Sequence, residues 1–463
     1  MRETISASLL DGDKLALTSR RGTVGAVLAR AASIFASFAL TLVVARTLGV
    51  EAAGAFFVVF TGVAVVATFG RFGTDNLALK LVGGASGDIP GDVRRLIEIA
   101  IVASIVGASL AAVLAVVFRA APAGVGFWAV IGLATAVIPQ ALAVLAGSFL
   151  RAKGRLAVGT FAELGSLPAL TSVGILVSFV LHANTLQTAI VCLVASSWLT
   201  ALWSLLLTWQ VLRVPVPVSE SASTSASALL TRAEPMSVTT FFGRHSGPLA
   251  AMMGTSLIFY VLTWVPIFLL SATGSLEAVS FYTAAARLCG FVGLIPAIQV
   301  SYLAPAFARL FQAREMPALN KLCANSSVVA FSLATLPALV LIFFSRPVLE
   351  IAYGVEYEPA ALALSLLTFG VLVSVWSGQV NQLMLLCDLE RFALILNVAL
   401  LAAWFAVGWW AAQQGGLTGV VIVSVTTTIV YQAAAIIRLH RAASILSFAR
   451  IMREPKAIRK TPV

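Results

Sequence analysis

Arg287 has the clearest capacity for chemistry in this sequence, because it lies inside a long apolar run, 279–304. At 1.5 Å per helical residue it sits about 12 Å from the start of that run, and Ser280 and Thr283 share its helical stripe. A guanidinium stays charged in apolar surroundings and binds phosphate through a bidentate fork. Since ionisable residues within a membrane usually serve function, we expect Arg287 to contact an anionic substrate. The alternative is a structural arginine that pairs with a carboxylate or a helix-end carbonyl.

A second polar stripe begins at Arg30. Ser33, Ser37 and Thr41 follow at offsets of three, seven and eleven residues, so all four side chains share one face of a helix. We expect Arg30 and Ser37 to line a cavity and contact substrate. In the alternative, Arg30 extends to the headgroups and the hydroxyls only pack helices together.

Two acidic residues stand near the ends of apolar runs. Asp75 follows Arg71 by four residues, a spacing that permits an ion pair at an inner gate or a diphosphate site. A solvated pair that sets topology is the alternative. Glu163 lies about two turns into another run, where a buried carboxylate is a candidate proton or cation site. Its alternative is pairing with nearby basic residues, namely Arg151, Lys153 or Arg155.

Amides inside apolar runs suit sugar hydroxyls. Asn381 and Gln299 are the candidates for glycan contact, although such amides also bridge helices in lipid. The sequence contains no Walker A motif, no dinucleotide-binding glycine pattern and no metal triad. The four cysteines are far apart and lack metal-ligand spacing. We therefore expect no cofactor, no metal and no catalytic residue.

The composition of the chain predicts the helices that position these residues. Of 463 residues, 60% are hydrophobic and 11% charged, with a mean hydropathy of +1.00. Soluble proteins carry about 25% charged residues. Long apolar runs without strand alternation are typical of membrane-spanning helices. The sequence predicts an all-α polytopic membrane protein with about twelve such helices, at 25–45, 52–70, 97–118, 126–149, 157–181, 186–210, 249–271, 279–304, 325–345, 361–386, 392–412 and 416–437.

The basic residues predict orientation. Of the 30 lysines and arginines, only Arg46, Arg119 and Arg346 fall in loops on one side, and Arg287 falls inside a run. Basic residues near spans stay on the cytoplasmic side, so both termini are expected in the cytoplasm. This distribution also explains the net charge of +11 without a nucleic acid partner, which would require a basic patch on a water-exposed fold.

A serine-rich stretch divides the chain into two six-helix bundles, 25–210 and 249–437. We expect a cytoplasmic linker at 211–248, an N-terminal cytoplasmic tail at 1–24 and a basic cytoplasmic tail at 438–463. This last tail fits an amphipathic helix on membrane lipids, although topology alone also explains its charge. Residues 49–56 weakly resemble residues 274–282, which indicates a parallel repeat of six plus six helices around a central cavity.

Several stretches share their residues and order with a known family. They are ARTLGVEAAG at 45–54, FGTDNLALK at 72–80, FYTAAARL at 281–288, LAPAFARL at 303–310 and YGVEY at 353–357. Together they resemble flippases of the Wzx type, in the polysaccharide branch of the multidrug/oligosaccharidyl-lipid/polysaccharide exporter superfamily. One departure is at 259–266, where members often carry an aspartate and this chain has none, so no ion-coupling role is transferred there.

The resemblance implies a function. Such a flippase moves oligosaccharide repeat units linked to undecaprenyl diphosphate across the bacterial cytoplasmic membrane by alternating access. The product feeds O-antigen, capsule or exopolysaccharide assembly, with a polysaccharide polymerase and chain-length proteins as possible partners.

Two other functions remain open. A multidrug or organic-cation antiporter of the same superfamily would place acidic groups in the cavity, whereas the charges inside the runs here are more basic than acidic. A membrane-embedded glycan polymerase or glycosyltransferase would need paired acidic residues or a large external loop. Only Glu350, Glu356 and Glu358 cluster on the outer side, so we expect no enzyme.

Overall fold

The computed structural model describes residues 2–83, 89–117, 126–213, 237–387, 389–443, 445 and 447–449. Every regular element within these ranges is a helix, which confirms the predicted all-α class. The N-terminal half contains α1 (Arg2–Leu48), α2 (Val50–Arg71), α3 (Thr74–Gly83), α4 (Ile89–Val117), α5 (Gly126–Ala152), α6 (Leu156–Leu164), α7 (Ser166–Val180) and α8 (Leu186–Arg213). The C-terminal half contains α10 (Val238–Ala272), α11 (Leu276–Gln312), α12 (Met316–Phe343), α13 (Ser345–Tyr353), η2 (Val355–Ala360), α14 (Ala361–Ser377), α15 (Val380–Leu386), α16 (Glu390–Ala403), η3 (Trp404–Gly408) and α17 (Trp409–Ala443).

Ten helical segments in the described ranges are long and apolar enough to cross a membrane, or eleven when α6 and α7 count as one bent span. One of the ten, Glu390–Ala442, has 53 residues. At 1.5 Å per residue a straight helix of that length would measure about 80 Å, more than twice the hydrocarbon thickness. Backbone angles that are not helical break it at Gly416. If α6 and α7 count as one span and Glu390–Ala442 counts as two, the total is twelve, the number that the sequence predicts.

The fifth predicted span, 157–181, is broken into α6 and α7, which meet at 52°. A Cβ atom at Gly165 would lie 2.7 Å from Ser33 Oγ of α1, so the bend lets α1 approach closely. Pro168 falls in the first turn of α7, where its missing N–H costs no helical hydrogen bond. The apolar run alone does not show this break.

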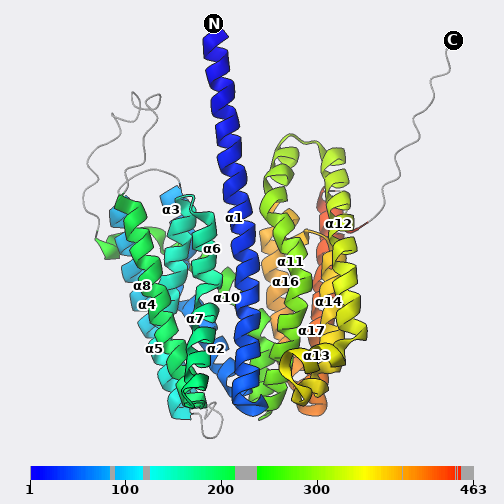
Figure 1. The fold of residues 1–463 in the computed structure, drawn as a ribbon. Helices are drawn as coiled ribbons and strands as arrows, with labels where there is room; N and C mark the ends of the chain where they lie inside the picture. The colour runs from blue at the N-terminus through cyan, green and yellow to red at the C-terminus, as the bar shows by residue number, and fades with distance from the viewer. Residues whose placement is uncertain are drawn as a thin grey trace, which may run out of the picture.

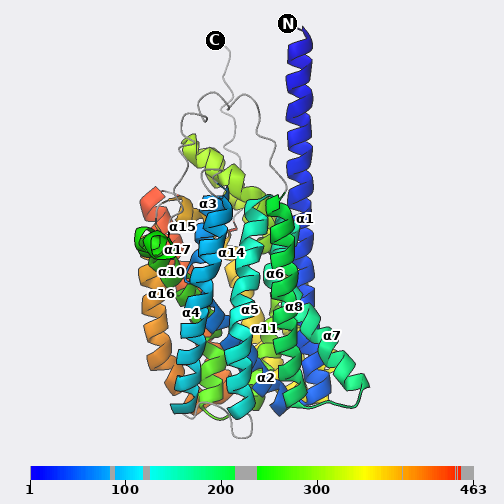
Figure 2. The same ribbon diagram turned by 90° about the vertical axis from the view of Figure 1, so that its left-hand side faces the viewer.

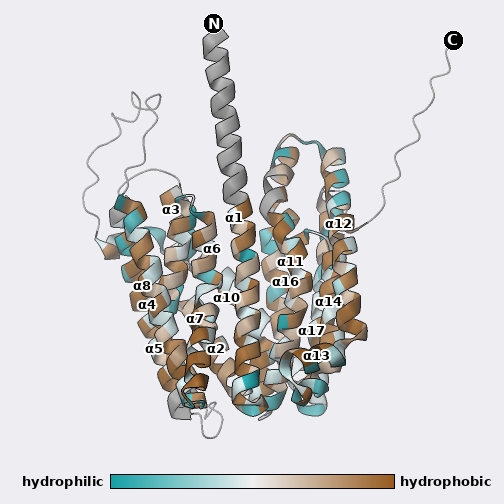
Figure 3. Ribbon diagram, in the orientation of Figure 1, coloured by the Kyte–Doolittle hydropathy of each residue, from teal (hydrophilic) through white to brown (hydrophobic). Residues whose placement is uncertain are grey.

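The helices form two lobes with α1 standing between them (Figure 1). Turning the molecule shows that α8 ends and α10 begins at one end, which we call the linker end, while α1 meets α2 at the opposite end, the turn end (Figure 2). The main contacts between the lobes join α2 and α1 to α11. Hydrophobic residues dominate the middle of the helices, as expected of surfaces in contact with lipid (Figure 3).

Helix α10 packs against both lobes. Phe241 and Leu249 near its start are buried in the same cluster as Leu96 of α4. Leu270 near its end is buried in the large cluster that joins α1, α2, α11 and α14. Residues 238–248 of the expected linker therefore belong to α10, 211–213 end α8, and 214–236 lie outside the described residues. Likewise, residues 2–24 of the expected N-terminal tail are helical and continue into α1.

The chain after α17 returns to the C-terminal lobe. Ile445 and Ser447 are buried, and the backbone N–H of Ala449 donates to the carbonyl of Trp376 at 2.8 Å. Ser327 Oγ donates to the Ser447 carbonyl at 2.7 Å. These contacts meet at Gly378, where α14 ends with a positive φ of 80°. The remainder of the predicted tail, 450–463, lies outside the described residues.

Candidate functional site

Arg287 lies on α11, eleven residues after the helix begins at Leu276, and so about 17 Å from the turn end. Its guanidinium carbon is 5.6 Å from the centre of the Trp264 ring on α10, within cation–π range. The neighbouring turn of α11 carries Phe291, which packs against Phe35 and Phe38 of α1. Arg287 therefore lies where α10, α11 and α1 come together. No carboxylate within the described part of the chain forms an ion pair with it.

Two further donors near Arg287 have no acceptor. The buried Nε1 of Trp264 and the buried hydroxyl of Tyr353 make no hydrogen bond to any described residue. Tyr353 is 3% exposed and lies close enough to Arg287 for the positive charge of that arginine to act on its hydroxyl. Burial raises the pKa of Tyr353, so its hydroxyl remains a donor at neutral pH. Two buried donors without acceptors, from α10 and α13, thus lie in the neighbourhood of Arg287 on α11, and unmet buried donors are costly.

Helix α10 connects Arg287 to a second arginine. Tyr260 lies one turn before Trp264, and its ring centre is 5.5 Å from the guanidinium carbon of Arg71. The two aromatic rings are separated by about 6 Å along the helix axis. Arg71 of the N-terminal lobe and Arg287 of the C-terminal lobe therefore contact aromatic rings on consecutive turns of α10, on the same face of that helix.

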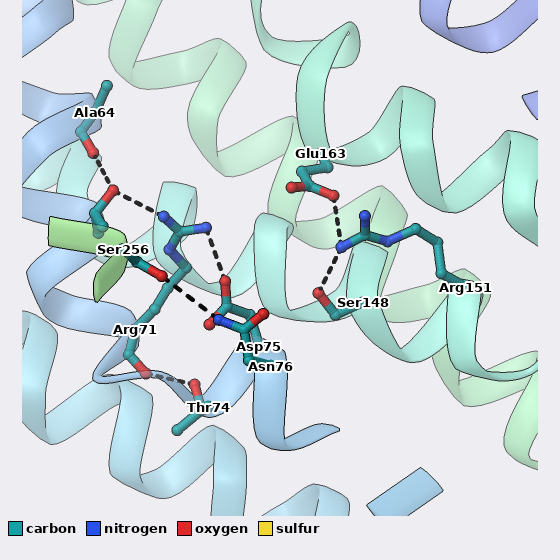
Figure 4. A network of polar contacts seen from close by, with 10 residues as sticks. Ala64, Arg71, Thr74, Asp75, Asn76, Ser148, Arg151, Glu163 and Ser256 are labelled. Atoms are coloured by element: carbon teal, nitrogen blue, oxygen red, sulfur yellow. Dashed lines mark hydrogen bonds and ion pairs between the residues drawn. The ribbon is translucent and has the colours of Figure 1, made fainter. Parts of the chain in front are cut away.

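Arg71 is only 4% exposed and belongs to a polar network at the linker end (Figure 4). Its Nη1 lies 3.2 Å from Asp75 Oδ2, and its Nη2 donates to Thr68 Oγ1 at 2.7 Å. Its Nε is buried with no acceptor among the described residues. The spacing of Arg71 and Asp75 permitted an ion pair, and the structure contains it. Arg71 is buried and Asp75 is partly buried, so the pair is largely shielded from solvent.

Glu163 faces this network from α6 (Figure 4). Its carboxylate lies 2.8 Å from Arg151 Nη2 of α5, and Arg151 also donates to Ser148 Oγ at 3.1 Å. The charges of Arg71, Asp75 and Arg30 also act on Glu163. The structure thus contains the Arg151 pairing that was the alternative for Glu163. Five helices contribute these charged side chains, three basic and two acidic.

The stripe on α1 has a different environment. Arg30 is exposed, Ser37 is partly buried, and Ser33 and Thr41 are buried. Ser33 donates to the Ala29 carbonyl and Thr41 to the Ser37 carbonyl, each four residues back along the helix. The hydrogen bonds of these two hydroxyls are thus made within α1, in the region where α1 packs against α6, α7 and α11. This arrangement favours helix packing for Ser33 and Thr41.

A cavity of about 640 Å³ lies in the C-terminal lobe between α10, α16 and α17. Asn381 lines it and accepts a hydrogen bond from the Tyr431 hydroxyl at 2.7 Å. Gln299 is not among the lining residues; it is buried and donates to the Ser326 carbonyl at 3.1 Å, bridging α11 to α12. Polar side chains within or beside apolar runs were a usable signal for the other polar lining residues, none of which was predicted: Thr255, Thr263, Tyr282, Glu390, Asn397, Ser424, Thr427, Thr428, Tyr431 and Gln432.

Within the described ranges, no group of three or more histidine, cysteine, aspartate or glutamate side chains is placed to hold a metal ion.

Comparison with known proteins identifies the fold. No family model matches the chain, and no curated protein sequence matches it. An inward-facing multidrug resistance MATE family transporter of the MOP superfamily is similar over 90% of this chain and 98% of its own, at 14% identity and a TM-score of 0.64. The lipid II flippase MurJ, in an inward closed conformation, is similar over 90% of this chain and 87% of its own, at 12% identity and a TM-score of 0.60. The MATE transporter VcmN of Vibrio cholerae, in a mutant form, is similar over 93% and 98%, at 16% identity and a TM-score of 0.55.

The chain shares the fold of these transporters. Sequence identities this low show the fold alone. These similar structures are transporters and a flippase, not enzymes, and the flippase is named for lipid II.

Proposed function

We propose that this protein is a flippase that moves an oligosaccharide linked to undecaprenyl diphosphate across a bacterial cytoplasmic membrane. The observation that carries the proposal is the set of donors around Arg287. A guanidinium on α11 has an indole on α10 and a phenol on α13 as neighbours, and the indole N–H and the phenol hydroxyl have no described acceptor. A diphosphate offers charged oxygens to all three donors. The MurJ likeness and the resemblance to Wzx-type flippases support the same substrate class.

In this proposal the linker end faces the cytoplasm and both termini lie there, as the distribution of basic residues predicts. The diphosphate meets Arg71 first, because that arginine lies at the linker end of α2. It then passes to Arg287 along the face of α10 that carries Tyr260 and Trp264. The ion pairs of Asp75 and Glu163 supply charged groups at the entrance whose partners can exchange as the lobes move.

The glycan needs neutral hydrogen-bonding groups instead of charges. Asn381, Tyr431 and Gln432 on the C-terminal lobe cavity fit that need, since amides and hydroxyls both donate and accept. Delivery of the flipped product to a polysaccharide polymerase with chain-length proteins completes the proposed role.

The test is transport of a fluorescent undecaprenyl-diphosphate oligosaccharide in proteoliposomes. Losing hydrogen bonds to a charged group costs about 1.5 to 3 kcal/mol, so Arg287→Ala should slow flipping by about 10- to 150-fold. Arg287→Lys keeps the charge and should retain part of the rate. Arg309→Ala is the matched control, because Arg309 is an exposed arginine in the last turn of the same helix. Equal rates for Arg287→Ala and Arg309→Ala would refute the proposal.

Two observations favour a second candidate, an organic-cation antiporter. Glu390 lines the C-terminal lobe cavity, and a carboxylate there suits a cation. The MATE likeness points the same way. Efflux of a cationic dye that is lost in Glu390→Gln, together with no flipping of any lipid-linked glycan by the unmodified protein, would establish this function instead.

A further inference from the structure

Arg46 forms a polar contact between the lobes at the turn end. It lies in the last turn of α1 and donates from Nε to the carbonyl of Ala352 at 3.0 Å and from Nη2 to the carbonyl of Ile351 at 2.6 Å. Both acceptors belong to α13 of the C-terminal lobe, about 305 residues further along the chain. One side chain therefore joins the two lobes through two hydrogen bonds.

Both acceptors are carbonyls in the last turn of α13, where a helix has no N–H partner for its carbonyls. Helix α13 stops at Gly354, whose N–H bonds to the carbonyls of Leu349 and Glu350. The next two carbonyls, of Ile351 and Ala352, receive Arg46. A helix C-terminus carries partial negative charge and unpaired carbonyls, so a guanidinium there is favoured twice over. On the other side, Asn184 donates to the carbonyl of Thr47, which fixes the end of α1 to its own lobe.

The same short helix reaches the donors around Arg287. Tyr353 follows Ala352 directly, and its ring packs 6.0 Å from the ring of Phe38 on α1. Its hydroxyl has no described acceptor, and the positive charge of Arg287 acts on it. Helix α13 has nine residues, so Tyr353 and the two carbonyls that hold Arg46 belong to one short element.

We propose that Arg46 latches the turn end shut and that α13 couples this latch to occupancy of the anion site around Arg287. Separating the lobes at the turn end requires both Arg46 hydrogen bonds to break. A diphosphate that engages Tyr353 shifts α13 and weakens them. The latch stands on the Arg46 contacts alone, whereas the coupling rests on the proposed function.

The test measures the distance between the lobes by double electron–electron resonance in nanodiscs. Spin labels are placed at Gln187 and Glu356, which are exposed at the turn end of each lobe, after the four native cysteines are replaced. Arg46→Ala should raise the population with separated lobes about five- to tenfold over the unmodified protein. Arg346→Ala is the matched control, because Arg346 begins the same helix but pairs with Glu358 of its own lobe at 3.4 Å.

The coupling is tested by adding undecaprenyl diphosphate. It should increase the separated population in the unmodified protein and leave Tyr353→Phe unchanged, since that variant keeps the ring and lacks the hydroxyl. Identical distributions for Arg46→Ala and Arg346→Ala would overturn the latch. An equal response to the diphosphate in Tyr353→Phe and the unmodified protein would overturn the coupling. The flipping assay with Arg287→Ala judges the proposed function separately.

Discussion

Gly54→Ala is a sharp test of how the two lobes meet. Gly54 lies on α2, and a Cβ atom there would stand 1.9 Å from the carbonyl oxygen of Leu276, at the start of α11. Contacts under 3.0 Å are essentially never seen for real Cβ atoms, so the two helices must separate by about 1.1 Å or more. The obstacle is a backbone atom and cannot rotate away.

The expected loss of stability follows from two opposing effects. Overpacking of a close contact costs about 1 to 3 kcal/mol, and replacing glycine by alanine inside a helix returns about 0.5 to 1 kcal/mol. Because the clash is with backbone, we expect a net loss of about 1 to 2 kcal/mol. The apparent melting temperature in detergent, followed by tryptophan fluorescence, should fall.

The matched control is Gly290→Ala on α11, where an added Cβ meets nothing within 4 Å. That variant should be as stable as the unmodified protein or slightly more so. The lobe distance between labels at Gln187 and Glu356 should lengthen in Gly54→Ala alone. Equal melting temperatures and equal distances for the two variants would show that α2 and α11 do not touch as described.

Three further changes give separate readouts. Arg151→Met should lower the apparent melting temperature more than Arg151→Met with Glu163→Gln, because the single change leaves a mostly buried carboxylate without its partner; the reverse order would contradict the pairing. Gly378→Ala should speed chymotrypsin cleavage after Phe448, since its Cβ would lie 2.2 Å from the Ser447 oxygen, while Gly415→Ala, with open space around it, should not. Asn184→Ala should raise the separated-lobe population less than Arg46→Ala does, because it only loosens the end of α1; a larger effect would assign the latch to Asn184.

The fold class and the number of spans could be predicted because lipid leaves the backbone few options. Each long apolar run must satisfy its own polar groups, so hydropathy alone locates helices such as α2 and α5. The ion pair of Arg71 and Asp75 could be anticipated from its four-residue spacing, although the structure forms it across the break between α2 and α3 and not within one helix. In both cases the information lies within a few turns of chain.

Contacts between distant parts of the chain were out of reach. Nothing near Arg46 indicates that its acceptors are carbonyls some 305 residues away. Similarly, the sequence shows that Trp264 and Tyr353 are aromatic but not that they neighbour Arg287 and that their buried polar atoms lack acceptors. At the break near Gly165, Ser33 of another helix lies close by, and hydropathy does not record such a contact.

The sharing of α10 between the lobes has a mechanical consequence. Phe241 and Leu249 anchor one part of this helix in the N-terminal lobe, and Leu270 anchors its other end in the core that reaches the C-terminal lobe. If the lobes rock, α10 cannot move as a rigid rod with either one and must bend. Pro248 and Pro266 lie inside it, and each removes a backbone hydrogen bond from the ladder. Bending of α10 is therefore expected to concentrate at these two prolines.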